Sequence, residues 1–226
     1  TSLLIDRSTL TRLNDQSSIW TDIMPAPVNE TRDKILDTAM RLFLEQGFQA
    51  TGISTILREA GVHSGSLYHA FPNKEALLVG VLQRYQAGLR PIVMDPVEKA
   101  EPDPLERIFT LLAWYRSNMV ATGCRLGCPI GNLALEVSDT YPAVRPEIDK
   151  NFENWADAIL AWREEAGDRL PASCERRALS RFVLTVMEGG LMQVRTHDSL
   201  EPFDQSVAQL RAYVEALRVQ ADAEKQ

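Results

Sequence analysis

The chain has 226 residues, 45% of them hydrophobic and 24% charged, and its formal net charge is −7. This composition suits one or two globular domains with a sizeable buried core and excludes a largely disordered chain. The negative charge argues against a protein that coats nucleic acid without sequence preference, because that mode depends on neutralising phosphates.

The first residues carry no sustained hydrophobic period. Residues 1–28 end with Pro25-Ala-Pro27, a loop signal, which predicts a flexible N-terminal extension. Met24 is either a natural start with upstream sequence attached or part of an ordinary N-terminal arm. From Thr31 onward a helical period with regular stop signals predicts four helices, at about residues 31–47, 52–60, 64–72 and 74–91.

Longer helices are predicted after a proline-rich break at residues 91–104. Asp103 followed by Pro104 forms an N-cap and first-turn proline and opens the first of them. The apolar periods then predict a short helix and three long ones, at about residues 130–137, 146–167, 175–196 and 202–221. No alternating strand pattern and no internal repeat occurs. The predicted fold class is therefore all-α, with about nine helices.

Two short helices joined by a turn that contains Gly61, with a third helix packed behind them, predict a three-helix helix-turn-helix domain at residues 29–78. The apolar positions that hold such a unit together leave a set of small and polar residues facing outward: Ser54, Ser64, Gly65, Ser66, Tyr68 and His69. Small side chains at the start of the second short helix let the backbone approach base edges closely. The alternative is that the arrangement only packs three helices compactly.

The charge distribution is compatible with DNA contact by this domain. Residues 29–85 carry six basic and six acidic side chains, whereas residues 86–226 carry 16 basic and 22 acidic ones. The acidity therefore belongs to the C-terminal part. Thr51, Tyr68 and Lys74 can each bond a phosphate oxygen, and the free amides that start the second and fourth helices add positive ends.

Residues 31–78, TRDKILDTAMRLFLEQGFQATGISTILREAGVHSGSLYHAFPNKEALL, resemble the N-terminal domain of the TetR family of bacterial repressors. Leu57 stands where the family usually has alanine, and Gly52 where it has a second Thr or Ser. The resemblance implies base contacts from Ser64, Gly65, Ser66 and Ser54. It implies phosphate contacts from Thr51, Tyr68, His69 and Lys74. It also implies a homodimer that binds a near-palindromic operator as a repressor and releases it when a small ligand enters the C-terminal domain.

Residues 79–226 are expected to form a helical domain for ligand binding and dimerisation. A single helix-turn-helix rarely gives enough affinity, so two-fold pairing is predicted. The helices at about 175–196 and 202–221 each carry an apolar stripe, and Gly189-Gly190 on the first would let helices cross closely. The resemblance to the TetR family implies that these two helices form the dimer interface. Packing within one chain is the alternative role of these helices. Large side chains on the middle helices could line a pocket for an apolar or aromatic effector, or simply fill the core: Trp114, Tyr115, Met119, Phe152 and Trp155.

The segment GCRLGCPIGNLALEVSD, residues 123–139, contains Cys124 and Cys128. A cysteine at a helix N-terminus has its thiolate stabilised by the helix dipole and, here, by Arg125. The segment also resembles a subgroup of TetR-type repressors that control acrylate metabolism and the detoxification of N-ethylmaleimide and other electrophiles. In those, a cysteine stands directly before an aliphatic pair, Gly and Asn. Cys128 occupies that place, although Pro129 replaces the usual leucine. Cys128 is either a sensor or a buried structural cysteine.

A thiol enzyme and an architectural DNA protein are the alternatives to a regulator. A thiol enzyme acting through Cys124 and Cys128 is not supported, because no histidine lies near them in sequence and no triad spacing appears. The acidic balance argues against an architectural DNA protein. We expect neither a metal site nor a cofactor, since the cysteines and three histidines are not arranged as a ligand set. With no signal segment and no apolar run of the length that crosses a bilayer, a cytoplasmic location without membrane contact is predicted.

Overall fold

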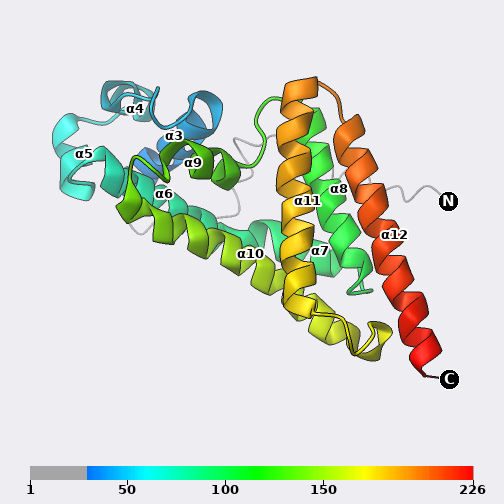
Figure 1. Ribbon diagram of the computed structural model, residues 1–226. Coiled ribbons are helices and arrows are strands. Elements are labelled where there is room, and N and C mark those ends of the chain that lie inside the picture. The colour runs from blue at the N-terminus through cyan, green and yellow to red at the C-terminus, as the bar shows by residue number, and fades with distance from the viewer. Residues whose placement is uncertain (1–29, 226) are drawn as a thin grey trace. The chain divides into compact units, whose positions relative to one another are not determined.

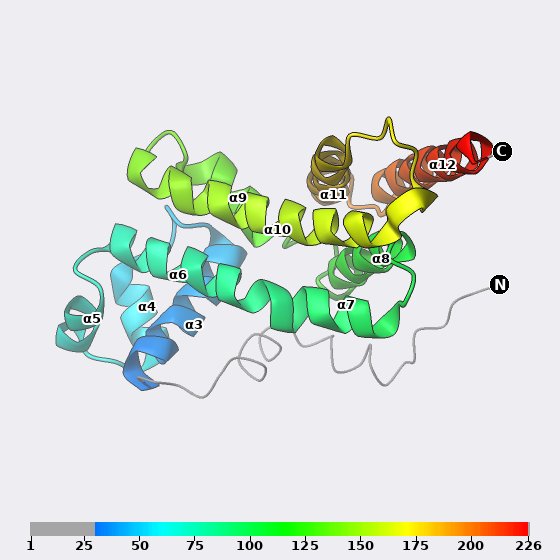
Figure 2. The same ribbon diagram turned by 90° about the horizontal axis from the view of Figure 1, so that it is seen from below.

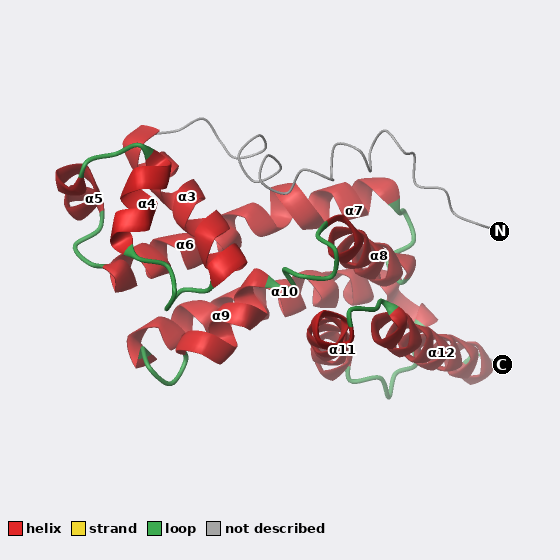
Figure 3. Ribbon diagram, turned by 90° about the horizontal axis from the view of Figure 1, so that it is seen from above, coloured by secondary structure: helices red, strands yellow, loops and turns green. Residues whose placement is uncertain are grey.

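The computed structural model describes residues 30–225, which form helices and loops without any strand in that range (Figure 1; Figure 3). The all-α prediction is therefore confirmed. The predicted N-terminal extension and Met24 lie outside the described residues. None of the described helices combines the length and the apolar character needed to span a bilayer.

The helix bounds follow the stop signals in the sequence closely. They are α3 (Glu30–Gln46), α4 (Ile53–Ala60), α5 (Ser64–Ala70), α6 (Lys74–Gly88), α7 (Asp95–Ala100), α8 (Glu106–Ala121), α9 (Pro129–Val137), α10 (Arg145–Ala166), α11 (Arg176–His197) and α12 (Glu201–Glu224).

The described chain divides into two compact units. The first contains the residues up to Ile92 together with Pro129–Asn151, and the second contains Val93–Cys128 together with the residues from Phe152 onward. Helix α9 thus packs in the same unit as α3 to α6, although 40 residues separate its start from the end of α6. The predicted boundary between a DNA-binding domain and a ligand-binding domain, at residues 78 and 79, divides the chain into two continuous segments. This assignment of function to the two segments stays a prediction.

Helix α3 is at the centre of the first unit and contacts α4, α5, α6 and α9 (Figure 2). Its apolar face, Ile35, Ala39, Leu42 and Phe43, is fully buried. Burying this face is the main force that assembles the three-helix unit, since each such side chain contributes roughly 1.5–3 kcal/mol when removed from water. The short helices α4 and α5 are too short to be stable alone and depend on α3 for their position.

The second unit is built on α8, α11 and α12, and α11 and α12 lie side by side (Figure 1). Gly190 of α11 makes this approach possible, because a Cβ at that position would come within 2.7 Å of the Phe203 ring of α12. Of the pair Gly189-Gly190, Gly190 makes the close crossing within one chain, since a Cβ at Gly189 would meet nothing within 4 Å.

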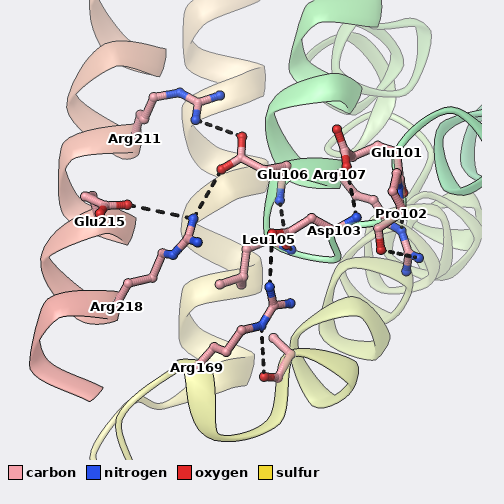
Figure 4. A network of polar contacts seen from close by, with 11 residues as sticks. Glu101, Pro102, Asp103, Leu105, Glu106, Arg107, Arg169, Arg211, Glu215 and Arg218 are labelled. Atoms are coloured by element: carbon pink, nitrogen blue, oxygen red, sulfur yellow. Dashed lines mark hydrogen bonds and ion pairs between the residues drawn. The ribbon is translucent and has the colours of Figure 1, made fainter. Parts of the chain in front are cut away.

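A polar network holds α12 against the start of α8 (Figure 4). The Asp103 carboxylate accepts hydrogen bonds from the Leu105 and Glu106 amides at 2.8 and 3.5 Å, which satisfies free donors at the start of α8. Arg211 and Arg218 of α12 donate to the Glu106 carboxylate at 2.9 and 3.4 Å. Several charges share these contacts, so α12 has a defined position on α8.

The prediction of a break between residues 91 and 104 is wrong in part. A π-helical stretch, Leu89–Met94, follows α6 and leads into α7. Pro96 is in the first turn of α7, where a proline is tolerated because the N–H groups there have no partner within the helix. Pro91 is within the wider π-helical turn, and such turns accommodate irregularities in a helix.

Candidate functional site

The turn between α4 and α5 has the geometry of a helix-turn-helix. Gly61 ends α4 with φ of 64°, in the left-handed region that a residue with a Cβ rarely adopts. Its N–H donates to the Arg58 carbonyl, and the Val62 N–H donates to the Leu57 carbonyl. Ile56 of α4 and Leu67 of α5 are fully buried and anchor the two helices on α3. The rest of α5 is therefore free to face outward.

Most of the predicted DNA contacts lie on the exposed side of these two helices. The exposed residues are Ser54, Ser64, Gly65, Tyr68 and His69, and Ser66 is half-buried. The Tyr68 side chain is 53% exposed, which is unusual for a large aromatic residue on a single short helix. The exposed face thus presents small groups, backbone and one phenol, as base and phosphate contacts require.

Thr51 and Lys74, two of the predicted phosphate contacts, are used inside the protein. Thr51 is fully buried, and its hydroxyl donates to the Gly47 carbonyl at 2.7 Å. The Lys74 ammonium donates to the Phe48 carbonyl and lies 4.2 Å from the centre of the Phe48 ring. Burial lowers the pKa of Lys74, and the Glu136 carboxylate partly offsets this effect. Both side chains therefore stabilise the turn between α3 and α4.

The two helix starts that were expected to offer free amides differ. Asn73 caps α6, since its side-chain oxygen accepts from the Ala76 N–H at 2.7 Å. At α4 the N-cap is Gly52, which has no side chain to cap the helix. The departure from the usual Thr or Ser at this position leaves the α4 amides as the uncapped positive end.

Sequence reasoning missed Glu136 of α9. Its carboxylate accepts hydrogen bonds from the Phe48 N–H at 2.9 Å and from the Gln49 N–H at 2.6 Å. These amides are in the turn between α3 and α4, 87 and 88 residues away in sequence. The only local signal was an acidic residue near the end of an otherwise apolar short helix, which usually marks a solvated position.

In the second unit, Cys128 belongs to a cluster of polar groups. Cys128 is only 8% exposed, and its thiol is hydrogen-bonded to the Glu188 carboxyl group. The Tyr115 hydroxyl accepts from the Trp155 indole N–H at 3.1 Å, and the Trp114 ring lies edge-on, 5.0 Å from the Tyr115 ring. Burial raises the pKa of Tyr115 well above 10 and keeps the phenol neutral.

The structure thus brings together four residues of the predicted effector site: Trp114, Tyr115, Trp155 and Cys128. It adds Glu188, which the sequence did not predict because it lies on a helix with an apolar stripe, α11. Two polar atoms of this group, Glu188 Oε1 and Trp114 Nε1, are buried without a hydrogen-bond partner. An unpaired acceptor and an unpaired donor could both be satisfied by a bound ligand.

The other predicted effector residues have different surroundings. Met119 is buried in the core, and Phe152 is half-buried at the start of the second unit's α10 segment. Cys124 lies in the turn after α8 with φ of 61°, and its N–H donates to the Met119 carbonyl at 2.8 Å. Cys124 therefore shapes the turn that leads to Cys128.

Replacing Glu188 with glutamine is expected to raise the melting temperature at pH 7.5 and to have little effect near pH 4. Burial raises the pKa of Glu188 above its ordinary value of 4.5, although the hydrogen bond with Cys128 opposes the shift. The folded protein therefore holds this proton more tightly than the unfolded chain, and the carboxyl's contribution to stability falls as pH rises through the raised pKa. Glutamine keeps the acceptor oxygen but cannot ionise, so the gain in stability is the cost of ionising the buried carboxyl group at pH 7.5.

Thermal melting from pH 4 to pH 8 measures this effect. Glu164→Gln is the control, because the Glu164 side chain is 63% exposed and should show no comparable pH dependence. Equal melting temperatures for Glu188→Gln and the wild type at pH 7.5 would mean that burial does not disfavour the ionised form of Glu188.

Comparison with known proteins gives two matches to family profiles. Residues 35–81 match the profile of bacterial regulatory proteins of the tetR family, and residues 104–209 match the C-terminal domain of LmrA/YxaF-like transcriptional regulators. The first match contains α4 and α5, and the second contains the Cys128 cluster.

Individual relatives match over most of their length. An uncharacterized HTH-type transcriptional regulator of Bacillus subtilis, YxaF, is 32% identical over 76% of this chain and 89% of its own. The HTH-type transcriptional repressor NemR of Escherichia coli is 28% identical over 81% of this chain and 93% of its own. The crystal structure of reduced E. coli NemR has a TM-score of 0.70 at 27% identity, over 80% of this chain and 96% of that one. These relatives are regulators and not enzymes, so the thiol-enzyme hypothesis is wrong. The chain belongs to the TetR family of transcriptional regulators.

Proposed function

We propose that this regulator is a homodimeric repressor that binds a near-palindromic operator and releases it when a small-molecule effector reaches its second unit. The observation that carries the proposal is the exposed face of α4 and α5. Base contacts are assigned to Ser54, Ser64, Gly65 and Ser66, and phosphate contacts to Tyr68, His69 and the uncapped start of α4. Thr51 and Lys74 are assigned to holding the turn between α3 and α4. A bacterial operator implies a cytoplasmic location.

The proposed dimer interface is the outer face of α11 and α12. A groove of about 860 Å³ lies between these helices and is lined by residues of both, among them Phe182 and Tyr213. These two side chains are 44% and 49% exposed, and their rings are 6.0 Å apart. The exposure of Phe182 on α11 favours the interface role. Apolar surface of this kind on a single chain typically marks an interaction site.

Pairing through α11 and α12 would set the distance between the reading helices, α4 and α5, of one subunit and those of the other. Two-fold symmetry then requires an operator whose half-sites are inverted repeats, with centres about one helical turn or a multiple of it apart. An effector can bind more tightly to a dimer in which the α4–α5 pairs of the two subunits lie at a different separation. It then lowers the affinity of the dimer for the operator by the difference between its binding energies for the two arrangements.

The proposed effector site is the cluster around Cys128 and Tyr115, and the proposed effector class is a small electrophile. A carboxylate at Glu188 can accept the thiol proton as the sulfur forms its bond to carbon, and the neutral Tyr115 hydroxyl can donate to the oxygen that gains charge. Helix α9 starts at Pro129, directly after Cys128 in the chain. A covalent change at the thiol therefore occurs beside the helix that carries Glu136.

Cys128→Ser is expected to retain operator binding and to lose release by acrylate or by quinones. The measurement is operator occupancy by fluorescence anisotropy before and after incubation with each compound, with mass spectrometry to locate the adduct. Cys124→Ser is the matched control and should respond as the wild type does. If Cys128→Ser were released as readily as the wild type, the sensor assignment would be wrong.

A further inference from the structure

The turn between α3 and α4, residues 47–52, is held from outside the helix-turn-helix. The Glu136 carboxylate bridges two consecutive amides of this turn, Phe48 and Gln49. Charge-assisted hydrogen bonds of this type are about twice as strong as neutral ones. Glu136 is half-buried on α9, and α9 packs against α3 in the same compact unit. The turn thus has a fixed charged support that does not belong to the helix-turn-helix sequence.

Gly47 makes room for this support. It has φ of 87°, in the left-handed region, and a Cβ there would meet both carboxylate oxygens of Glu136 at 3.2 Å. A larger residue would be strained in its own backbone and would also push the carboxylate away from the amides. Two constraints therefore favour glycine at position 47: the positive φ and the space occupied by the Glu136 carboxylate.

Lys74 holds the other side of the same turn. Its ammonium donates to the Phe48 carbonyl, so the Phe48 residue is bound through its N–H by Glu136 and through its C=O by Lys74. The electrostatic interaction between Lys74 and Glu136 links the two supports. Lys74 is also the first residue of α6, directly after the segment that ends α5. The supports therefore connect the start of α4 with the end of α5.

We propose that Glu136 is a positioning residue for operator recognition: from α9 it fixes the turn that sets the pose of α4 and α5. Glu136 itself makes no contact with DNA in this proposal. Glu136 affects binding by holding α4 and α5 in one orientation in the free protein. Less conformational entropy is then lost when the operator binds. Sequence readout by this helix-turn-helix then depends on a helix outside the residues that form it.

The test compares Glu136→Gln with Asp139→Asn. Both changes remove one negative charge, and they are three residues apart. Asp139 is fully exposed and forms a surface ion pair with Arg145 at 3.3 Å, so it serves as the matched control. Glu136→Gln keeps the shape of the side chain but removes the charge that strengthens both hydrogen bonds. We expect roughly tenfold weaker operator binding for Glu136→Gln and no change for Asp139→Asn.

A second measurement separates positioning from simple loss of stability. Each variant is titrated with its operator and with an operator that carries one extra base pair between the half-sites. Wild-type protein should discriminate strongly between the two, because one base pair rotates a half-site by about one tenth of a turn. Glu136→Gln should discriminate less, because its reading helices are free to adjust. A partly unfolded variant would instead lose active protein and keep the same discrimination.

The outcomes distinguish this proposal from that of DNA binding itself. If the wild type recognised no operator, sequence-specific binding would fail and the role of Glu136 with it. If the wild type bound specifically and Glu136→Gln matched it in affinity and in discrimination between spacings, the positioning role alone would be overturned. Reduced affinity with unchanged discrimination would also overturn it.

Discussion

Replacing Gly65 with glutamate is expected to weaken operator binding by at least about a hundredfold while leaving α5 folded. Gly65 is exposed, and a Cβ added there would meet no other atom of the protein within 4 Å. The new carboxylate would project toward base edges and phosphates, where it is repelled and has no donor. Glutamate is about 1 kcal/mol better than glycine in a helix and is favoured in a first turn, so the melting temperature should rise slightly.

Fluorescence anisotropy with an operator duplex measures the affinity, and circular dichroism measures the melting temperature. Gly65→Ala is the control, since it adds the same helix preference without the charge and should lose far less affinity. Wild-type affinity in Gly65→Glu would show that α5 does not face the bases.

The double substitution Phe182→Glu with Tyr213→Glu is expected to convert the proposed dimer into a monomer. These two half-exposed rings form an edge-on pair over the groove between α11 and α12. In a two-fold interface each change occurs twice, so four carboxylates would be buried close together without partners. Operator affinity should then fall by about two orders of magnitude or more, because each half-site is bound separately.

Sedimentation velocity measures the oligomeric state, and the same anisotropy titration measures the affinity. Val120→Glu is the control, because Val120 is 54% exposed but belongs to α8 rather than to the proposed interface. A double variant that remained dimeric would contradict the interface assigned to α11 and α12.

Much of the fold could be predicted because its helix ends carry local signals. Gly47 and Gly61 have the positive φ values that glycine permits, and each ends a helix where the sequence predicted an end. Helix α7 is not predicted by the sequence, because its prolines indicate a break. Pro96 occupies a first-turn position, where it favours a helix rather than stopping one. A proline therefore needs its position within the turn before it can be used as a stop signal.

The exposure of the proposed DNA-contact residues could be predicted, because it follows from the pattern of neighbouring residues on one short helix. Ser64, Gly65 and Tyr68 follow one another on a short helix, and their exposure agrees with the alternation of buried Leu67 and polar residues. Glu136 and Glu188 were not predictable, because each acts through contacts with residues far away in the sequence. A carboxylate on a mostly apolar helix does not indicate whether solvent, an amide or a thiol is its partner.

Selection from a pool of random DNA duplexes tests the central claim most directly, namely that α4 and α5 of two subunits read DNA sequence. The account predicts convergence on an inverted repeat whose half-site centres are about one helical turn, or a multiple of it, apart, with binding that survives excess competitor DNA. A pool that showed no enrichment, with binding that depended only on ionic strength, would contradict it.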